Sequence, residues 1–140
     1  MKIFESKREI AAAPDALFDA FANSAILAKW WGPAGFTNAF EIFEFKQNGT
    51  WKFVMHGPDG KNYPNECKFL EISRPGKVVI RHASEPKFTL TVTITESDGG
   101  SSVHWAQDFD SVDVAKAIAH IVQPANEQNL DRLSAWFTSS

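Results

Sequence analysis

The chain has 140 residues and a formal net charge of −3, and this length fits one domain with one sizeable core. The acidic balance, without a basic run, excludes the electrostatic footprint of a protein that binds nucleic acid or an anionic membrane. The single cysteine, Cys67, excludes an internal disulfide, and no apolar run approaches the roughly 20 residues that span a bilayer. Because the N-terminus also lacks the apolar core of a signal peptide, we predict one cytoplasmic domain over residues 1–140.

The N-terminal part predicts a strand followed by two short helices. Residues 3–11 have the length and the partial alternation of a strand, with charged side chains on one face. Pro14 opens a first short helix, because its missing backbone donor does no harm in a first turn. Asn23 supplies a cap for a second short helix, which the Gly32-Pro33 pair ends.

Six strand-like runs follow, separated by turn residues. They cover residues 36–45, 51–56, 63–72, 78–82, 88–94 and 103–109. In the first run the apolar phase shifts between Ile42 and Phe43, which indicates a bulge or a strand buried on both faces. The Asn48-Gly49 pair after this run is typical of a type I′ hairpin turn. Short turns between successive strands predict an antiparallel meander.

The longest helical pattern lies at the C-terminus, from Ser111 to Phe137, where apolar residues recur at helical spacing. Ser111 is the predicted N-cap, and Asp113 places negative charge in the first turn, where it suits the helix dipole. Pro124 interrupts the pattern, so the helix either kinks or divides in two. We favour a short helix that leads into a longer one.

The order of these elements predicts an α+β fold. An antiparallel meander has an apolar face that needs a cover, and the C-terminal pattern provides the only long apolar helix face. We therefore expect a curved antiparallel sheet of about seven strands wrapped around a long C-terminal helix, with two short helices after the first strand. The meander leaves edge strands, which are either covered or paired with a second copy in a homodimer.

Two groups of motifs resemble a known family. The first group is Lys29-Trp30-Trp31-Gly32-Pro33, Phe36, Asn48-Gly49-Thr50-Trp51, Pro58-Asp59-Gly60, Tyr63 and Glu71-Ile72-Ser73-Arg74-Pro75. The second is Pro124-Ala125-Asn126-Glu127-Gln128-Asn129-Leu130-Asp131-Arg132-Leu133, which is similar to the family's last helix. Over nearly the whole chain, they resemble proteins similar to the activator of the ninety-kilodalton heat-shock protein ATPase. These belong to the START-like, birch-pollen-allergen-like superfamily, also called SRPBCC.

The resemblance implies a helix-grip fold with a cavity between the sheet and the terminal helix. In this superfamily such a cavity often accommodates an apolar ligand, but the motifs name no particular ligand. The eukaryotic co-chaperone also has a separate N-terminal domain, for which this chain has no room. A chaperone ATPase is therefore a less favoured partner than a small apolar molecule.

The aromatic residues are the sharpest functional feature. Twelve Phe and five Trp for one Tyr form a heavily apolar set, suited to lining a cavity, although a solidly packed core is the alternative. Trp30 is interpreted as a structural anchor. The candidate ligand-binding residues between sheet and helix are Trp31, Phe36, Trp51, Phe53, Met55, Tyr63, Cys67, Phe69, Ile80, His82, Phe88, Leu90, Trp105, Gln107, Ile121, Ala125, Asn129 and Leu133.

The sequence contains none of the known local catalytic motifs, so we predict no catalytic residue, cofactor or metal site. The four histidines lie on different elements without the spacing of a metal site: His56, His82, His104 and His120. If the strand alternation holds, His82 and Gln107 are polar groups in an apolar cavity, whereas His104 points outward. Cys67, in the middle of a strand, is interpreted as a small buried hydrophobic residue.

We favour the binding of a small hydrophobic or aromatic molecule as the function. A protein-interaction module that acts on a heat-shock ATPase is the first alternative, and it requires an exposed apolar patch around Trp30-Trp31 or on the convex face of the sheet. A cyclase, dehydratase or hydrolase is the second alternative. It requires at least two of the side chains His82, Tyr63 and Gln107 to meet within hydrogen-bonding distance in one pocket.

Overall fold

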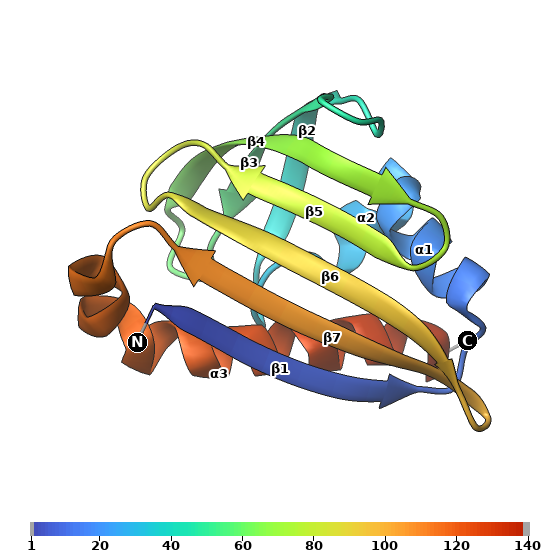
Figure 1. Cartoon of the computed structure of the whole chain (residues 1–140). Helices are drawn as coiled ribbons and strands as arrows, with labels where there is room; N and C mark the ends of the chain where they lie inside the picture. Colours follow the sequence, from blue (N-terminus) through green and yellow to red (C-terminus); the bar gives the residue numbers. More distant parts are fainter. Residues whose placement is uncertain (1, 139–140) are drawn as a thin grey trace.

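The computed structural model describes residues 2–138 and has the predicted order of elements. These are β1 (Ile3–Ile10), α1 (Pro14–Ala22), α2 (Ser24–Trp30), β2 (Thr37–Phe43), β3 (Thr50–His56), β4 (Asn62–Ser73), β5 (Lys77–His82), β6 (Phe88–Ser97), β7 (Gly100–Phe109) and α3 (Val112–Thr138). Figure 1 shows the sheet curving over α3, with α1 and α2 on the same side near one end. The predicted α+β fold, a curved sheet around a long C-terminal helix, is confirmed.

The seven strands form one antiparallel sheet in the order β1-β7-β6-β5-β4-β3-β2. Strands β2 to β7 pair with their neighbours in the chain, as expected of a meander. The N-terminal strand β1 instead pairs with β7 along its whole length, from Ile3 opposite Asp108 to Ile10 opposite Ser101. The edges of the sheet are therefore β1 and β2, which come from the first third of the chain.

Strand β2 contains the predicted irregularity, but at a slightly earlier position. Its register against β3 shifts between Phe40 and Ile42, whereas the sequence placed the shift between Ile42 and Phe43. The extra residue lets Phe40 and Phe43 both pack against the core, with their rings stacked at a centroid distance of 5.6 Å.

The connection between β2 and β3 differs from the predicted type I′ turn. It spans residues 44–49, and a positive φ occurs at Asn48, at 64°, but not at Gly49. A type I′ turn needs positive φ at both central residues, so the prediction is wrong. The loop instead pairs with β4: Asn48 N–H donates to Phe69 O at 2.7 Å, and Phe69 N–H donates to Gly49 O at 3.0 Å. Gly49 lies so close to the Glu44 carbonyl that a Cβ would clash with it.

Helix α3 is one helix of 27 residues, so the predicted division at Pro124 is wrong. Proline has no N–H and leaves the carbonyl of His120 without its helical partner. Both residues are exposed, so solvent can hydrate this carbonyl and the helix continues. The predicted start of the helix is confirmed, because the Ser111 hydroxyl oxygen accepts a hydrogen bond from Val114 N–H at 3.2 Å.

The main core lies between the concave face of the sheet and the helices. The Trp51 ring is stacked with those of Phe53 and Phe69, at centroid distances of 4.3 and 5.7 Å. Trp30 is 1% exposed, and its indole N–H donates to Ala20 O at 3.0 Å, as expected of a structural anchor. A large part of the aromatic set therefore forms solid packing where α1 and α2 cover the sheet.

The end of α2 is joined to the middle of α3 by the side chain of Asn129. Its Oδ1 accepts from Gly32 N–H at 3.2 Å, and its Nδ2 donates to Trp30 O at 3.0 Å. Asn129 is 5% exposed, so both ends of a buried amide are satisfied by backbone. Gly32 has a φ of 98°, which a glycine adopts without strain and which turns the chain away from the helix.

Arg132, three residues further along α3, completes this joint. Its Nη2 donates to Lys29 O at 2.8 Å, and its Nη1 lies 3.0, 3.1 and 3.0 Å from the carbonyl oxygens of Trp31, Gly32 and Pro33. Carbonyls at a helix C-terminus lack intrahelical partners and favour a cation. We call these contacts of Asn129 and Arg132 with residues 29–33 the α2–α3 joint.

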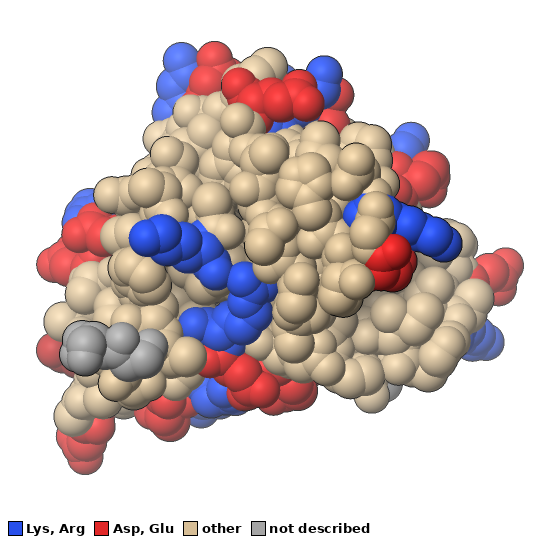
Figure 2. Space-filling model, turned by 180° about the vertical axis from the view of Figure 1, so that it is seen from behind, with Lys and Arg blue, Asp and Glu red and all other residues tan. Residues whose placement is uncertain are grey.

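Figure 2 shows the face of the molecule on which the helices lie. Acidic and basic side chains gather mainly around its outline, apart from a group of basic side chains left of the centre. No helix within residues 2–138 is long and apolar enough to cross a membrane. Charge therefore marks no broad binding surface on this face, and a candidate site has to be sought in the shape of the interior.

Arg132→Met tests the α2–α3 joint. We expect it to lower the free energy of unfolding by about 2 kcal/mol, because backbone carbonyls lose a charged donor. The matched control is Arg8→Met, which removes ion pairs with the exposed carboxylates of Glu127 and Asp131 and should cost less than about 1 kcal/mol. Urea denaturation followed by circular dichroism measures both losses. Equal losses in the two variants would contradict a special role for the joint.

Candidate functional site

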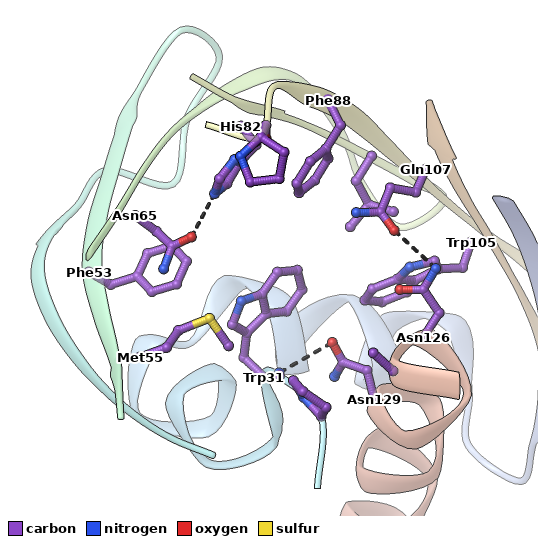
Figure 3. A pocket seen from close by; sticks show the side chains of 15 residues that line it. Trp31, Phe53, Met55, Asn65, His82, Phe88, Trp105, Gln107, Asn126 and Asn129 are labelled. Carbon is purple, nitrogen blue, oxygen red and sulfur yellow. Dashed lines mark hydrogen bonds between the residues drawn. The ribbon is translucent and has the colours of Figure 1, made fainter. Parts of the chain in front are cut away.

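A pocket of about 210 Å³ lies between the sheet and α3. Its walls come from β3 to β7, from the loop before β6, from the segment after α2 and from α3 (Figure 3). The lining residues are Trp31, Gly32, Pro33, Phe53, Met55, Asn65, His82, Pro86, Phe88, Leu90, Trp105, Gln107, Ala125, Asn126 and Asn129. None of them is an Asp, Glu, Lys or Arg.

The lining changes from exposed to buried across the pocket. Pro86 is exposed, and Pro33, Met55 and Asn65 are half-buried, so these residues form the rim. The opposite wall is formed by β7, where Trp105 is only 2% exposed. The pocket therefore leads from the surface to a buried inner end.

Aromatic rings provide most of the apolar wall. Trp31 follows the last residue of α2, and its carbonyl accepts hydrogen bonds from Arg132 and from Asn38 Nδ2. Its ring lies against Trp105 and Trp51, at centroid distances of 5.6 and 5.1 Å. The α2–α3 joint therefore sets the position of Trp31, which stands between the closed core and the pocket.

Three polar side chains lie together at the inner end: Trp105, Gln107 and Asn126, which we call the amide–indole cluster. Trp105 and Gln107 are two residues apart on β7 and so point to the same face, while Asn126 reaches them from α3 (Figure 3). Asn126 Nδ2 donates to Gln107 Oε1 at 3.0 Å, and each of these residues is 9% exposed. The indole N–H of Trp105 is buried and has no acceptor among residues 2–138.

His82, at the end of β5, lies between the inner end and the rim. Its Nδ1 is 2.8 Å from Pro86 O, its Nε2 is 2.6 Å from Asn65 Oδ1, and its ring is stacked on Phe88 at 4.5 Å. Two flanking oxygens favour the protonated ring, but burial disfavours it and is the larger effect. Burial therefore lowers the pKa of His82 below 6.5, despite the opposing contributions of the Pro86 carbonyl and Glu85.

Ten of the predicted ligand-binding residues line this pocket. They are Trp31, Phe53, Met55, His82, Phe88, Leu90, Trp105, Gln107, Ala125 and Asn129. The strand alternation thus placed His82 and Gln107 correctly in an apolar pocket. That these residues bind a ligand stays a prediction.

The other eight predicted residues lie elsewhere. Five are in the closed core: Trp51, Cys67, Phe69, Ile80 and Leu133. The strand residues among them face inward as predicted, but side chains of α1 and α2 fill the space there. Phe36 and Tyr63 pack against each other outside the pocket, with ring centroids 5.8 Å apart. Ile121 is 58% exposed, so it is not part of the α3 wall.

The position of Ile121 reflects an error of one residue in the predicted helix phase. Steps of four from Leu133 lead through Asn129 and Ala125 to Ile121, but each step overshoots a full turn by about 40°. The buried residues of α3 instead follow steps of three and four, through Asn126 to Val122. The helical period of 3.6 residues therefore carries the signal that would have identified Asn126.

Five lining residues were not predicted from the sequence: Gly32, Pro33, Asn65, Pro86 and Asn126. Asn65 lies two residues before Cys67 on β4, so the same alternation that placed the cysteine inside also points Asn65 inward. Pro86 lies in the loop between β5 and β6, where no periodic pattern predicts the direction of a side chain.

The side chains considered for catalysis do not converge. Tyr63 hydroxyl donates to Asp59 Oδ2 at 2.8 Å outside the pocket, whereas His82 and Gln107 line the pocket and bond to different partners. Burial raises the pKa of the Cys67 thiol to about 12, so this thiol stays protonated and is a poor nucleophile. No group of three His, Cys, Asp or Glu among residues 2–138 is arranged to hold a metal ion.

A curved antiparallel sheet around one long helix, with a pocket between them, defines a helix-grip-like protein of the α+β class. Residues 11–138 match the family described as Activator of Hsp90 ATPase homolog 1-like protein. The chain belongs to this family, as its tryptophan and C-terminal motifs predicted. Comparison with curated proteins gives no match.

Solved bacterial structures share the fold. A solution structure of a protein from Arthrobacter aurescens superposes with a TM-score of 0.90 and 19% identity, covering 99% of this chain and 87% of that chain. A crystal structure of a protein from Nitrosomonas europaea superposes with a TM-score of 0.87 and 16% identity, covering 98% of this chain and 94% of that chain. A crystal structure of a protein from Chromobacterium violaceum superposes with a TM-score of 0.85 and 18% identity, covering 98% of each chain. At these identities the similarity concerns the fold alone.

The lowered pKa of His82 predicts a pH dependence of stability. The unfolded chain, with a histidine pKa near 6.5, binds more protons than the folded chain as the pH falls below this value. The free energy of unfolding should therefore decrease as the pH falls from 6.5 through the folded-state pKa. Denaturation curves at several pH values measure the free energy of unfolding. In His82→Gln, the part of its pH dependence that comes from this histidine should be absent. An NMR titration of the His82 ring with a midpoint above 6.5 would contradict the prediction.

Proposed function

We propose that the protein binds a small apolar or aromatic molecule in the pocket between the sheet and α3. The observation that carries the proposal is a cavity of about 210 Å³ with aromatic walls beside a core that is otherwise solidly packed. A cavity of roughly 150 Å³ lined by apolar residues accommodates benzene, so this pocket has room for a somewhat larger molecule. The START-like fold commonly binds ligands, which agrees with this assignment.

Two features of the chain support a pocket that stays open. The α2–α3 joint holds the backbone of Trp31, and the Trp31 ring lies against Trp51 and Trp105, so turning this ring into the pocket would lose those ring contacts. On the opposite side, α3 presents the small Ala125, which leaves space that a larger residue would fill. We place this activity in the cytoplasm, where a single buried thiol such as Cys67 stays reduced.

The alternative function, a module that acts on a heat-shock ATPase, has less support. It calls for an exposed apolar patch, but Trp30 and Trp31 are only 1% and 9% exposed. The exposed large hydrophobic side chains on the sheet are spread over three strands: Ile3 on β1, Ile42 on β2, and Tyr63 and Leu70 on β4. Such scattered residues are normal on a soluble surface and weigh against this function.

Ala125→Leu tests the proposal by filling the pocket from α3. We expect it to weaken the binding of naphthalene about tenfold, because the added side chain occupies the space that the ring needs. The control, Ala117→Leu, lies at an exposed position of the same helix and should leave the affinity unchanged. Quenching of tryptophan fluorescence during a titration measures the affinity, since Trp31 and Trp105 line the pocket.

A second measurement searches for natural ligands. The protein is incubated with small-molecule extracts of bacterial cells, separated by gel filtration and denatured for mass spectrometry. A compound retained by the wild type and by Ala117→Leu, but not by Ala125→Leu, would support the proposal. Failure of naphthalene to bind, together with no retained compound from any extract, would overturn it.

A further inference from the structure

The amide–indole cluster has more hydrogen-bond donors than acceptors. Among residues 2–138, the bond from Asn126 Nδ2 to Gln107 Oε1 is the only one that its three polar groups make. Two N–H groups of Gln107, one of Asn126 and the indole N–H of Trp105 remain, against two lone pairs on the Asn126 carbonyl oxygen and one on that of Gln107. Turning both amides over leaves this count unchanged. The group that complements such a cluster is an oxygen with free lone pairs.

The surroundings favour an uncharged group over a carboxylate. No Lys or Arg lines the pocket, and burial lowers the pKa of His82, which disfavours a positive charge on this ring. Arg81, next to His82 in the chain, is already paired with Asp110 at 2.6 Å, and Arg132 is directed at backbone carbonyls. An ionised carboxylate at the inner end would be buried without a cation, which is costly. A ketone, ester, amide or lactone oxygen avoids this cost.

The size and walls of the pocket limit the rest of the molecule. About 210 Å³ accommodates a compound somewhat larger than benzene and is too small for a sterol or a two-chain lipid. The rings of Trp31, Phe53 and Phe88 lie on different sides of the space and can contact a flat ring at its faces and edges (Figure 3). One ring, or two fused rings, fits these walls.

We infer that the ligand is an uncharged molecule of one or two rings that carries a carbonyl group, whose oxygen accepts hydrogen bonds from Trp105 and Gln107 at the inner end of the pocket. This inference rests on the proposed function and names the chemical class of its ligand. The ring system lies toward Trp31 and Phe88, and the carbonyl oxygen lies beside the buried indole N–H of Trp105, which has no acceptor within residues 2–138.

Three matched probes test the inference: 1-indanone, indane and indane-1-carboxylate. They share one ring system and differ in having a carbonyl, no polar group or a charge. We expect 1-indanone to bind about tenfold more tightly than indane, as one or two neutral hydrogen bonds would give. The carboxylate should bind more weakly than 1-indanone at pH 7. Calorimetry or tryptophan quenching measures the three affinities.

Two variants locate the carbonyl. Trp105→Phe keeps an aromatic ring but removes the indole N–H, so it should abolish most of the preference for 1-indanone over indane. The matched control is Trp51→Phe, because Trp51 also has a buried N–H without an acceptor but lies in the closed core outside the pocket. Its preference for 1-indanone should equal that of the wild type.

An NMR experiment on the wild type makes the test independent of how the variants fold. Each of the five tryptophans gives one indole N–H resonance, and that of Trp105 should move downfield with 1-indanone but not with indane. Equal affinities for 1-indanone and indane, without this shift, would overturn the inference and leave the proposed function standing. Tightest binding of the carboxylate would also overturn it. If neither these probes nor naphthalene binds, the proposed function fails as well.

Discussion

The α2–α3 joint is the interaction on which the rest of the architecture depends. Asn129 and Gly32 lie 97 residues apart in the chain, yet the amide of one bonds to the backbone of the other. Through this contact and those of Arg132, the long helix is held against the segment that carries Trp31. The two sequence motifs that identify the family, around Trp30–Pro33 and around Asn129–Arg132, are thus the two halves of one contact.

This joint also divides the interior into two parts. On one side α1 and α2, which contact β6 and β2, form a closed core in which the rings of Trp51 and Phe69 are stacked. On the other side the cover consists of α3 and loops, and the small Ala125 leaves room. The same aromatic composition therefore serves packing in one half of the sheet and lines a pocket in the other.

The residues that sequence reasoning placed well are those whose direction follows from a local period. Alternation along a strand put Trp105 and Gln107 on one inward face, and the cap at Ser111 fixed the start of α3. The wall of α3 was harder, since steps of four residues drift around the helix and lead from Asn129 to the exposed Ile121 instead of to Asn126. A periodic pattern predicts which face of a helix is buried, but a small error in the assumed period grows with each further turn.

Other features depend on tertiary contacts that no local pattern contains. The Asn48-Gly49 pair has the composition of a tight hairpin, but its backbone groups bond to Phe69 on β4, which selects another turn. Strand alternation predicts that Cys67 and Trp105 both point inward. Only the placement of α1 and α2 decides which of the two borders the pocket. The sequence could thus predict which residues face inward, but not where the interior remains open.

The polar groups of the interior show how structural and ligand-binding roles can be told apart. Asn129 and Asn126 are the same residue type, one turn apart on one helix, and both are buried. Backbone satisfies both ends of the Asn129 amide, whereas Asn126 makes one bond, to Gln107. Each amide keeps one unused N–H, but backbone holds Asn129 at both ends, whereas the carbonyl oxygen of Asn126 accepts no hydrogen bond within residues 2–138 and leaves this amide open to a further partner.

The indole N–H groups of the buried tryptophans differ in the same way as the two asparagine amides. Trp30 donates to Ala20 O and is complete as an anchor, while both Trp51 and Trp105 have a buried N–H that finds no acceptor in the part of the chain that the structure describes. The unpaired N–H of Trp51 lies in closed packing, so an unsatisfied donor does not by itself indicate a binding site. Trp105 differs because it borders space and stands beside two further amides with spare donors. A buried donor becomes a recognition group only where the fold also leaves room for the atom that it would bind.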